Sequence, residues 1–419
     1  MRPPPPGPGR RLVALVVVAV ALAVAVWIVT PHVLSRGSSG GPGPTGAGGP
    51  RVVTIGVLAP LTGPGAPAGA EVRAAVEAAV ADAGQTRAVP GWTVKVRVED
   101  DGGTADTGVQ AATRLAADPT VAAVIGPLNG SVARGVQPIL ARGHVVVVAP
   151  AGGDPDLTRS ASGVPRRVSP TFFRLVAPSD AEPAFAAHYI RMTLDVVRVG
   201  LVVDTTPEAE AFATVFRDQL HREHGEIDVD VGHPAGDRPL DGTAATLAND
   251  GPGAVVAAGP PADAGALTEA DARHGLDVPT VGDHSMLDPA FLGAAGPAAE
   301  GSVAVVAGAP PGHQPGIESL RIREQDAHRS FDTIGPGPYA YDAAQLVLAA
   351  LAVELPGRAD LTLATRIAIL GEVQRADRDG VTGRLRFDAF GDVVERTVTV
   401  YRVQDGAWKD MGTGVAPGP

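Results

Sequence analysis

The chain has 419 residues, with 46 acidic and 34 basic side chains and a formal net charge of -12. This charge excludes nucleic acid as a main partner, because neutralising phosphates requires basic patches. The chain has no cysteine, which excludes disulfides, thiol catalysis and thiolate metal sites. Its length allows about two domains of ordinary size.

The N-terminal segment is strongly apolar. Residues 12–30 form an apolar run that follows the basic pair Arg10-Arg11. A run of this length spans a bilayer core of about 30 Å, and the basic residues before it keep residues 1–11 in the cytoplasm. Because no cysteine can carry a lipid, the sequence predicts an uncleaved single-pass membrane anchor with an extracellular C-terminal domain. A cleaved signal peptide is the alternative.

The composition changes after the apolar run. Residues 31–50 are rich in Gly, Pro and Ser and predict a flexible linker. From Arg51 on, the periodicity alternates between strands and helices, with a further strand and two helices within residues 301–352 and late strands within 384–403. The earlier strands are expected at 52–58, 93–99, 121–126, 144–149, 198–203, 227–231, 254–258 and 278–282, and the helices at 69–83, 106–117, 131–142, 207–224, 240–249 and 262–274.

This alternation predicts the fold class. Strands 121–126 and 144–149 are apolar on both faces, as a parallel sheet covered by helices requires. Strand–helix alternation with short loops is typical of doubly wound α/β architecture.

Glycines between the first strand and the first helix give a weak dinucleotide-binding pattern. Gly63, Gly65 and Gly69 have roughly the spacing of such a loop. Pro64 and Pro67 interrupt it, and each removes an N–H group that a pyrophosphate would need. We therefore expect no nucleotide cofactor.

Catalytic and metal-binding motifs are equally weak. His221 and His224 lie near Asp218 at a spacing that a metal could use, but a solvated polar helix end explains them as well. No His-Glu-x-x-His motif occurs. The sequence predicts no catalytic residues, no metal site and no cofactor, so the chain is not expected to be an enzyme.

Several short motifs occur in one order along residues 51–411. They lie at Ile55–Gly63, Val98–Gly102, Val121–Pro127, Phe173–Asp180, Tyr339–Ala343, Gly380–Gly383, Phe387–Asp392 and Asp405–Trp408. Together they resemble the leucine- and branched-chain-amino-acid-binding family of ABC-transporter solute-binding proteins.

The resemblance implies a type 1 periplasmic-binding-protein fold. In this fold, two doubly wound parallel-sheet lobes are joined by three crossings, and the ligand binds between them. Lobe 1 is expected at 51–175 and 303–385, lobe 2 at 176–302 and 386–411, and a tail at 412–419. The crossings are expected near Phe173–Pro178, Gly301–Val303 and Val381–Asp388.

The resemblance also implies a ligand site at the carboxyl ends of the strands. Lobe 1 is expected to contribute Leu61, Gly130, Ser131, Ala151, Gly153 and Asp154, and lobe 2 Glu208, Asp283 and His284.

The expected site departs from the family pattern. Amino-acid-binding members use a Ser after the third strand and a Thr after the fourth. Here the matching positions are Gly130 and Gly153, with Ser131 and Asp154 one step further on. These exchanges make the site wider and more acidic, which favours a solute that carries an amine.

The expected function is that of a solute-binding protein of an ABC importer. Its partners would be a small-molecule solute and the permease subunits in the membrane, and not nucleic acid. A ligand sensor or scaffold that kept the fold but lost the transport ligand is the alternative, because a fold does not dictate a function.

Overall fold

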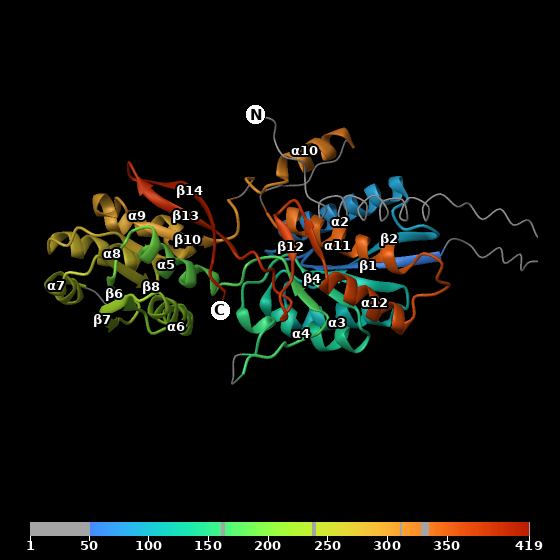
Figure 1. Cartoon of the computed structure of the whole chain (residues 1–419), viewed down its shortest axis with the longest axis horizontal. Coiled ribbons are helices and arrows are strands. Elements are labelled where there is room, and N and C mark those ends of the chain that lie inside the picture. Colours follow the sequence, from blue (N-terminus) through green and yellow to red (C-terminus); the bar gives the residue numbers. More distant parts are fainter. Residues whose placement is uncertain (1–50, 161–163, 237–239, 311, 328–334, 419) are drawn as a thin grey trace, which may run out of the picture. The chain divides into compact units, whose positions relative to one another are not determined.

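The computed structural model describes residues 51–160, 164–236, 240–310, 312–327 and 335–418 (Figure 1). The expected anchor at 12–30 and linker at 31–50 lie outside the described residues. Among the described helices, none combines the length and hydrophobicity that a bilayer crossing needs.

The first sheet is entirely parallel and forms the centre of lobe 1. Its strand order is β2-β1-β3-β4-β5. The strands are β1 (Arg51–Ala59), β2 (Trp92–Asp100), β3 (Val121–Ile125), β4 (Val146–Ala149) and β5 (Phe172–Arg174).

Helices cover both faces of this sheet (Figure 1). Apolar side chains of α2 (Ala66–Thr86), α11 (Gly337–Glu354) and α12 (Leu363–Gln374) pack on one face, together with Ile317 and Leu320 of α10 (Ile317–Asp326). The other face is covered by α3 (Ala105–Ala117) and α4 (Gly130–Arg142), and a short helix η1 (Pro155–Leu157) follows β4.

The second sheet is mixed and forms the centre of lobe 2. Its order is β14-β13-β10-β9-β8-β6-β7. Strands β6 (Arg198–Val203), β7 (Glu226–Gly232), β8 (Ala254–Ala258), β9 (Thr280–Gly282) and β10 (Val303–Ala307) are parallel. The hairpin of β13 (Thr397–Gln404) and β14 (Ala407–Val415) joins β10 in antiparallel orientation. The expectation of a parallel sheet is therefore correct for β6 to β10 and wrong for the β13–β14 hairpin.

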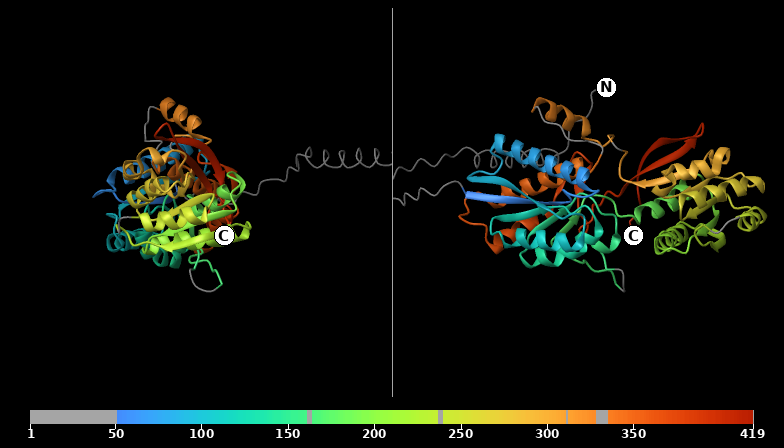
Figure 2. Two further views of the ribbon diagram at one scale, coloured as in Figure 1. Left: turned by 90° about the vertical axis from the view of Figure 1, so that its left-hand side faces the viewer. Right: turned by 180° about the vertical axis from the view of Figure 1, so that it is seen from behind.

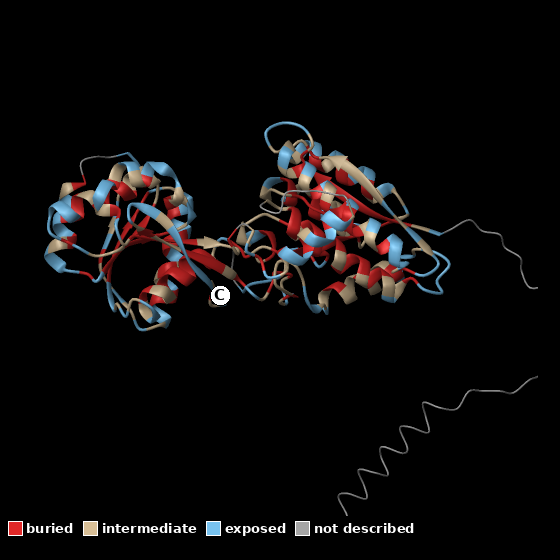
Figure 3. Ribbon diagram, turned by 90° about the horizontal axis from the view of Figure 1, so that it is seen from above, coloured by how far each residue is buried: buried red, intermediate tan, exposed pale blue. Residues whose placement is uncertain are grey.

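Lobe 2 also has two helical layers. Helices α5 (Ala181–Met192) and α6 (Pro207–Arg222) pack on one face. Helices α7 (Asp241–Asp250), α8 (Pro261–Arg273) and α9 (Pro289–Ala295) cover the other, with η2 (His284–Leu287) and η3 (Gly296–Ala299) beside them. Figure 2 shows the same elements from two further sides, and Figure 3 shows that buried residues concentrate on the strands.

Two expected lobe boundaries need correction. Strand β10 pairs with β9 and β13, so residues 303–307 belong to lobe 2 and not to lobe 1. Phe387 packs in the lobe 1 core against Phe173, with ring centroids 4.9 Å apart, although it was assigned to lobe 2. A small hairpin of β11 (Asp377–Asp379) and β12 (Arg384–Arg386) precedes it.

The strand and helix bounds place three chain crossings between the lobes. Their described residues are 175–180, 308–310 with 312–316, and 388–396. The first overlaps the expected position, whereas the second and third follow theirs by several residues. The crossings lie together, because Ala177, Gly308 and Val393 line one small cavity.

The glycines of the first turn are explained by packing. A Cβ atom at Gly69 would lie 1.8 Å from the carbonyl oxygen of Pro60, so only glycine allows α2 to approach the end of β1. Gly63 has a φ of +74°, which glycine adopts without steric cost. Backbone geometry therefore accounts for both residues without a phosphate ligand.

Candidate functional site

The carboxyl ends of the lobe 1 strands carry several of the expected site residues. Leu61 follows β1, and its N–H donates to Asp100 Oδ1 at 2.8 Å. Asp100 also accepts from Thr62 Oγ1 and from the N–H of Gly102. Partial burial acts to raise the pKa of Asp100, but these hydrogen bonds outweigh it and lower the pKa below its usual range. The N–H of Leu61 is thus already used by the protein.

Asp154 lies over the first residue of α4. A Cβ atom at Gly130 would be 2.0 Å from Asp154 Oδ2, so the carboxylate occupies the space that a serine side chain would need. Arg134, one turn into α4, holds this carboxylate at 2.9 Å and also pairs with Asp156 at 2.8 Å. Since helix N-termini attract anions, the position suits the carboxylate that the protein itself supplies.

The remaining expected site residues of lobe 1 are Ser131, Ala151 and Gly153. The hydroxyl of Ser131 donates to the side chain of Asn129, which caps α4 by accepting from the N–H of Val132. Ala151 and Gly153 lie in the loop after β4, and the Gly153 carbonyl accepts from the N–H of Ser179 at 2.8 Å. This loop therefore contacts the first crossing between the lobes.

In lobe 2, Asp283 and His284 directly follow β9. His284 Nδ1 lies 2.8 Å from Oε2 of Glu182, a carboxylate that is only 5 % exposed. The other oxygen of Glu182 accepts from the N–H of Ala307 at 2.9 Å. The hydrogen bond to Glu182 raises the pKa of His284 to about 9, so the imidazole is protonated near neutral pH.

This lobe 2 cluster is also where a metal could be held. One ligand atom each from Glu182, Asp283 and His284 lies within 4.8 Å of the others. A metal would require neutral histidine, however, and the proton shared with Glu182 opposes this. Elsewhere among the described residues no such group occurs, and this includes His221, His224 and Asp218, whose spacing a metal could use.

The structure does not bring all expected site residues together. Glu208 is exposed at the start of α6, and β8 lies between its strand β6 and the strand β9 that precedes Asp283. Among the described residues, no hydrogen bond or ion pair joins the expected lobe 1 residues to Glu208, Asp283 or His284. The assignment of these nine residues to one site remains a prediction.

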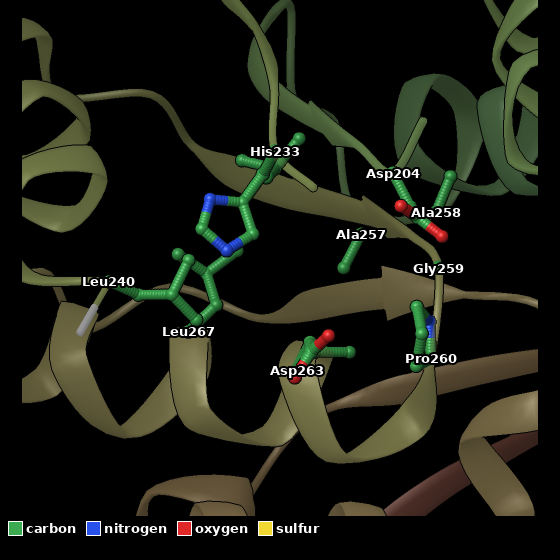
Figure 4. A pocket seen from close by; sticks show the side chains of 11 residues that line it. Asp204, His233, Leu240, Ala257, Ala258, Gly259, Pro260, Asp263 and Leu267 are labelled. Atoms are coloured by element: carbon green, nitrogen blue, oxygen red, sulfur yellow. The ribbon is translucent and has the colours of Figure 1, made fainter. Parts of the chain in front are cut away.

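A separate cavity in lobe 2 is too small for the expected ligand. It lies between the ends of β6 and β8 and helix α8, lined in part by Asp204, His233 and Asp263 (Figure 4). It encloses about 20 Å³, room for about one water molecule. Asp204 Oδ1 accepts from the N–H groups of Thr205 and Ala235, and its buried Oδ2 has no hydrogen-bond partner among the residues that the structure describes. The cavity therefore suits a water that completes the hydrogen bonding of Asp204.

Sequence reasoning missed Arg134 and Glu182. Each pairs with an expected site residue that is distant in the sequence. Arg134 pairs with Asp154, 20 residues further along the chain, and Glu182 pairs with His284, 102 residues further along. The only local signal was the position of Arg134 one turn after the strand-end loop. Nothing in the sequence connects Glu182 to His284.

Comparison with known proteins gives a consistent result. A family profile described as "Periplasmic binding protein" matches residues 52–407. The Leu/Ile/Val-binding protein homolog 1 of Brucella melitensis is 24% identical over 360 residues, which cover 85% of this chain and 91% of that protein.

Solved structures share the fold. A putative branched-chain amino acid ABC transporter from Rhodospirillum rubrum has a TM-score of 0.68 at 24% identity and covers 86% of this chain and 100% of its own. A substrate-binding protein from Desulfitobacterium hafniense in complex with Leu has a TM-score of 0.63 at 21% identity, and the match covers 86% of this chain and 100% of that one. The motifs, the two α/β lobes and these matches agree: the chain belongs to the leucine- and branched-chain-amino-acid-binding family of ABC-transporter solute-binding proteins.

Proposed function

We propose that this chain is the membrane-anchored extracellular receptor of an ABC importer and binds a small amine-bearing solute between its lobes. Its relatives support the transport role, since one is named a Leu/Ile/Val-binding protein homolog and another was solved with Leu. The ABC permease subunits would then be its partners.

The observation that carries the ligand class is the position of Asp154. Family members that bind amino acids place a serine hydroxyl where this chain has Gly130, and here the carboxylate of Asp154 fills that space. A ligand carboxylate at this position would meet a like charge at short range, which is unfavourable. An ammonium group would instead gain a charge-assisted hydrogen bond.

The charges at the ends of the strands support the same ligand class. In lobe 1, Arg134 faces two carboxylates, those of Asp154 and Asp156. In lobe 2, protonated His284 likewise faces two, those of Glu182 and Asp283. Each group therefore has one more negative than positive charge, so both lobes favour a cationic solute.

A thermal-shift experiment on the purified full chain tests the ligand class. The panel pairs each amino acid with its amide and with the matching amine and carboxylic acid. A ligand that binds only the folded state raises its stability, so the amines and amides should raise the Tm and the carboxylic acids should not. Stabilisation by the carboxylic acids alone would refute an amine-selective site.

The membrane anchor is proposed from the sequence. Residues 12–30 are apolar and no cysteine is available for lipidation. Protein recovered from the membrane fraction should begin at or near Met1. A soluble product that begins after residue 25 would show that the segment is a cleaved signal peptide.

A ligand sensor or scaffold is the second candidate. It is favoured by the glycine at position 130, because amino-acid-binding relatives use a serine hydroxyl there and the carboxylate of Asp154 fills that space in this chain. Uptake assays separate the two functions. Deletion of the chain should abolish uptake of the identified solute if it is a transport receptor, and should leave uptake intact if it is a sensor.

A further inference from the structure

Arg174 is a fully buried arginine at the end of β5 that the ligand site alone does not explain. Its side chain is 0% exposed. Its Nε and Nη2 donate to Oδ1 of Asp392 at 2.9 and 2.7 Å. Asp392 lies 218 residues further along the chain, in the third crossing. A buried guanidinium thus joins lobe 1 to a segment that connects the lobes.

The other donors of Arg174 hold the loop that follows β4. Nη1 donates to the carbonyl oxygens of Gly152 at 3.0 Å and Asp154 at 2.7 Å, and Nη2 to Thr158 Oγ1 at 3.1 Å. Gly153 and Asp154 belong to the proposed ligand site. The same side chain therefore contacts both the site loop and the third crossing.

The third crossing is fixed against β5 by its backbone as well. The N–H of Arg174 donates to the carbonyl of Gly391 at 2.9 Å, and the N–H of Val393 donates to the carbonyl of Arg174 at 3.1 Å. Thr158 Oγ1 donates to Oδ2 of Asp392 at 2.8 Å. The carboxylate of Asp392 thus has partners on both oxygens.

The ion pairs continue into the first crossing. Arg159 lies 3.6 Å from Asp392 and 3.9 Å from Asp180, which immediately precedes α5 of lobe 2. Asp180 also pairs with Arg396, which precedes β13 and donates to the carbonyl of Pro417. Two aspartates and three arginines therefore connect two crossings with the site loop.

We propose that Arg174 is a positioning residue that makes the ligand loop at 152–154 and the third crossing move as one unit. A contact made by a solute at the loop would then change the angle between the lobes, which is the motion of a hinge. This role rests on the proposed function, since it takes residues 152–154 as part of the ligand site.

The chemistry requires arginine in particular. The planar guanidinium donates in several fixed directions, which lets one side chain bind a carboxylate and two carbonyls together. A lysine at this position keeps the charge but has a single ammonium, which cannot reach all of these acceptors. Arg174→Lys should therefore weaken the coupling without introducing an unpaired buried carboxylate.

The test measures the distance between the lobes in the absence of any solute. Because the chain has no cysteine, Ala81→Cys on α2 and Ala245→Cys on α7, both at exposed positions, can carry spin labels. Arg174→Lys and Asp392→Asn are compared with the parent chain by pulsed electron double resonance. We expect the ratio of the lobe–lobe distance populations to change about tenfold, the effect of losing one charge-assisted hydrogen bond.

The matched control is Arg366→Lys. Arg366 also donates to two backbone carbonyls, those of Pro119 and Val121, but both lie within lobe 1. This variant should leave the distance distribution unchanged. Asp392→Glu keeps the charge and should restore part of the parent distribution.

The outcomes separate a hinge role from a structural one. If Arg174→Lys and Asp392→Asn lower the Tm but keep the parent distance distribution, Arg174 only stabilises the fold and the proposal is wrong. If Arg174→Lys does not fold, the distance distributions of Asp392→Asn and Asp392→Glu distinguish the hinge role from the structural one. Failure to find a solute would count against the proposed function alone, because the labels report on the free protein.

Discussion

The same pair of side-chain types, arginine and aspartate, occurs in two very different environments in this molecule. At the crossings, Arg174 and Asp392 are 0% and 3% exposed, and each has further hydrogen-bond partners. At the lobe 1 edge, Arg134 and Asp154 are 49% and 47% exposed. Water can replace either partner at the edge but not at the crossings. The crossings therefore use charge to fix the chain, whereas the edge keeps a charge that a ligand can approach.

Removing one arginine from each pair should give the largest difference. Arg174→Met leaves Asp392 buried without its main partner, and such a loss destabilises by about 3–5 kcal/mol. Arg134→Met breaks an exposed pair, which is worth about 1 kcal/mol or less. Urea unfolding of the two variants and the parent chain measures both free energies.

Asp392→Leu combined with Arg174→Met provides the control. Removing both charges leaves no isolated buried ion, so the double variant should be more stable than Arg174→Met alone. Equal losses for Arg174→Met and Arg134→Met would show that burial does not distinguish the two pairs.

Asp271 extends the comparison to a buried carboxyl without an arginine. It lies on α8, is 4% exposed, and neither oxygen has a hydrogen-bond partner among the described residues. Burial raises the pKa of Asp271 to about 7. Because the folded chain favours the protonated form, this carboxyl destabilises the fold as pH rises from about 4 through about 7, by up to about 4 kcal/mol.

Asp271→Asn should remove this pH-dependent loss. The variant and the parent should have similar stability near pH 4, and the variant should be more stable at pH 8. Thermal unfolding at both pH values measures the difference, and Asp263→Asn on the same helix serves as the control. A parent chain that loses no stability relative to the variant between pH 4 and 8 would contradict the buried-carboxyl explanation.

The fold could be predicted well where the periodicity was clear. The expected strands and helices between residues 52 and 282 are all present within a few residues of their predicted bounds. Helix α5 was missed because Ala181, Ala184, Phe185, Ala187 and other residues around its circumference are buried. A helix that is apolar on most sides gives no amphipathic pattern. The lobe 2 assignment of β10 was missed because sheet partners depend on tertiary pairing and not on the strand's own residues.

The candidate site was less predictable than the fold. The strand-end rule identified the loops that carry Asp154 and His284, and both lie there. It could not show that Asp154 would be held by Arg134, or that His284 would be held by Glu182. These pairs arise only when α4 and α5 pack beside the loops, so local sequence patterns do not contain them.

The next prediction uses the exposed pair as a ligand contact. Asp154→Ala should weaken binding of an amine ligand about 10- to 100-fold, the effect of one hydrogen bond between charged groups. Gly130→Ser should also weaken it, because the added Cβ would lie 2.0 Å from the Asp154 carboxylate and displace it. Isothermal titration calorimetry with an amine identified by the thermal-shift panel measures both effects.

Glu318→Ala is the matched control, since this carboxylate is 74% exposed on α10 and is not one of the expected site residues. It should bind like the parent chain. Unchanged affinity in both Asp154→Ala and Gly130→Ser would remove Asp154 from the ligand site, although the fold assignment would stand.

The smallest effect concerns the lobe 2 edge, where a buried carboxylate meets an exposed cation. The hydrogen bond that the His284 imidazole donates to Glu182 raises the pKa of His284 to about 9, above the value of about 6.5 for a free histidine. The pair therefore stabilises the fold fully below pH 6.5 and loses this effect as pH rises through 9. Since the imidazole is 63% exposed, the contribution should stay below about 1 kcal/mol.

His284→Gln should thus be slightly less stable than the parent chain at pH 6 and equally stable at pH 10. An NMR titration of the imidazole signals gives the pKa directly, with the His284 signal assigned by its absence from His284→Gln. Glu182→Gln should bring that pKa back toward 6.5. A pKa of His284 below 7 in the parent chain would mean that Glu182 does not stabilise the protonated imidazole. The lobe 2 edge would then carry two unneutralised carboxylates near pH 7, and it would attract a cationic solute more strongly than the lobe 1 edge.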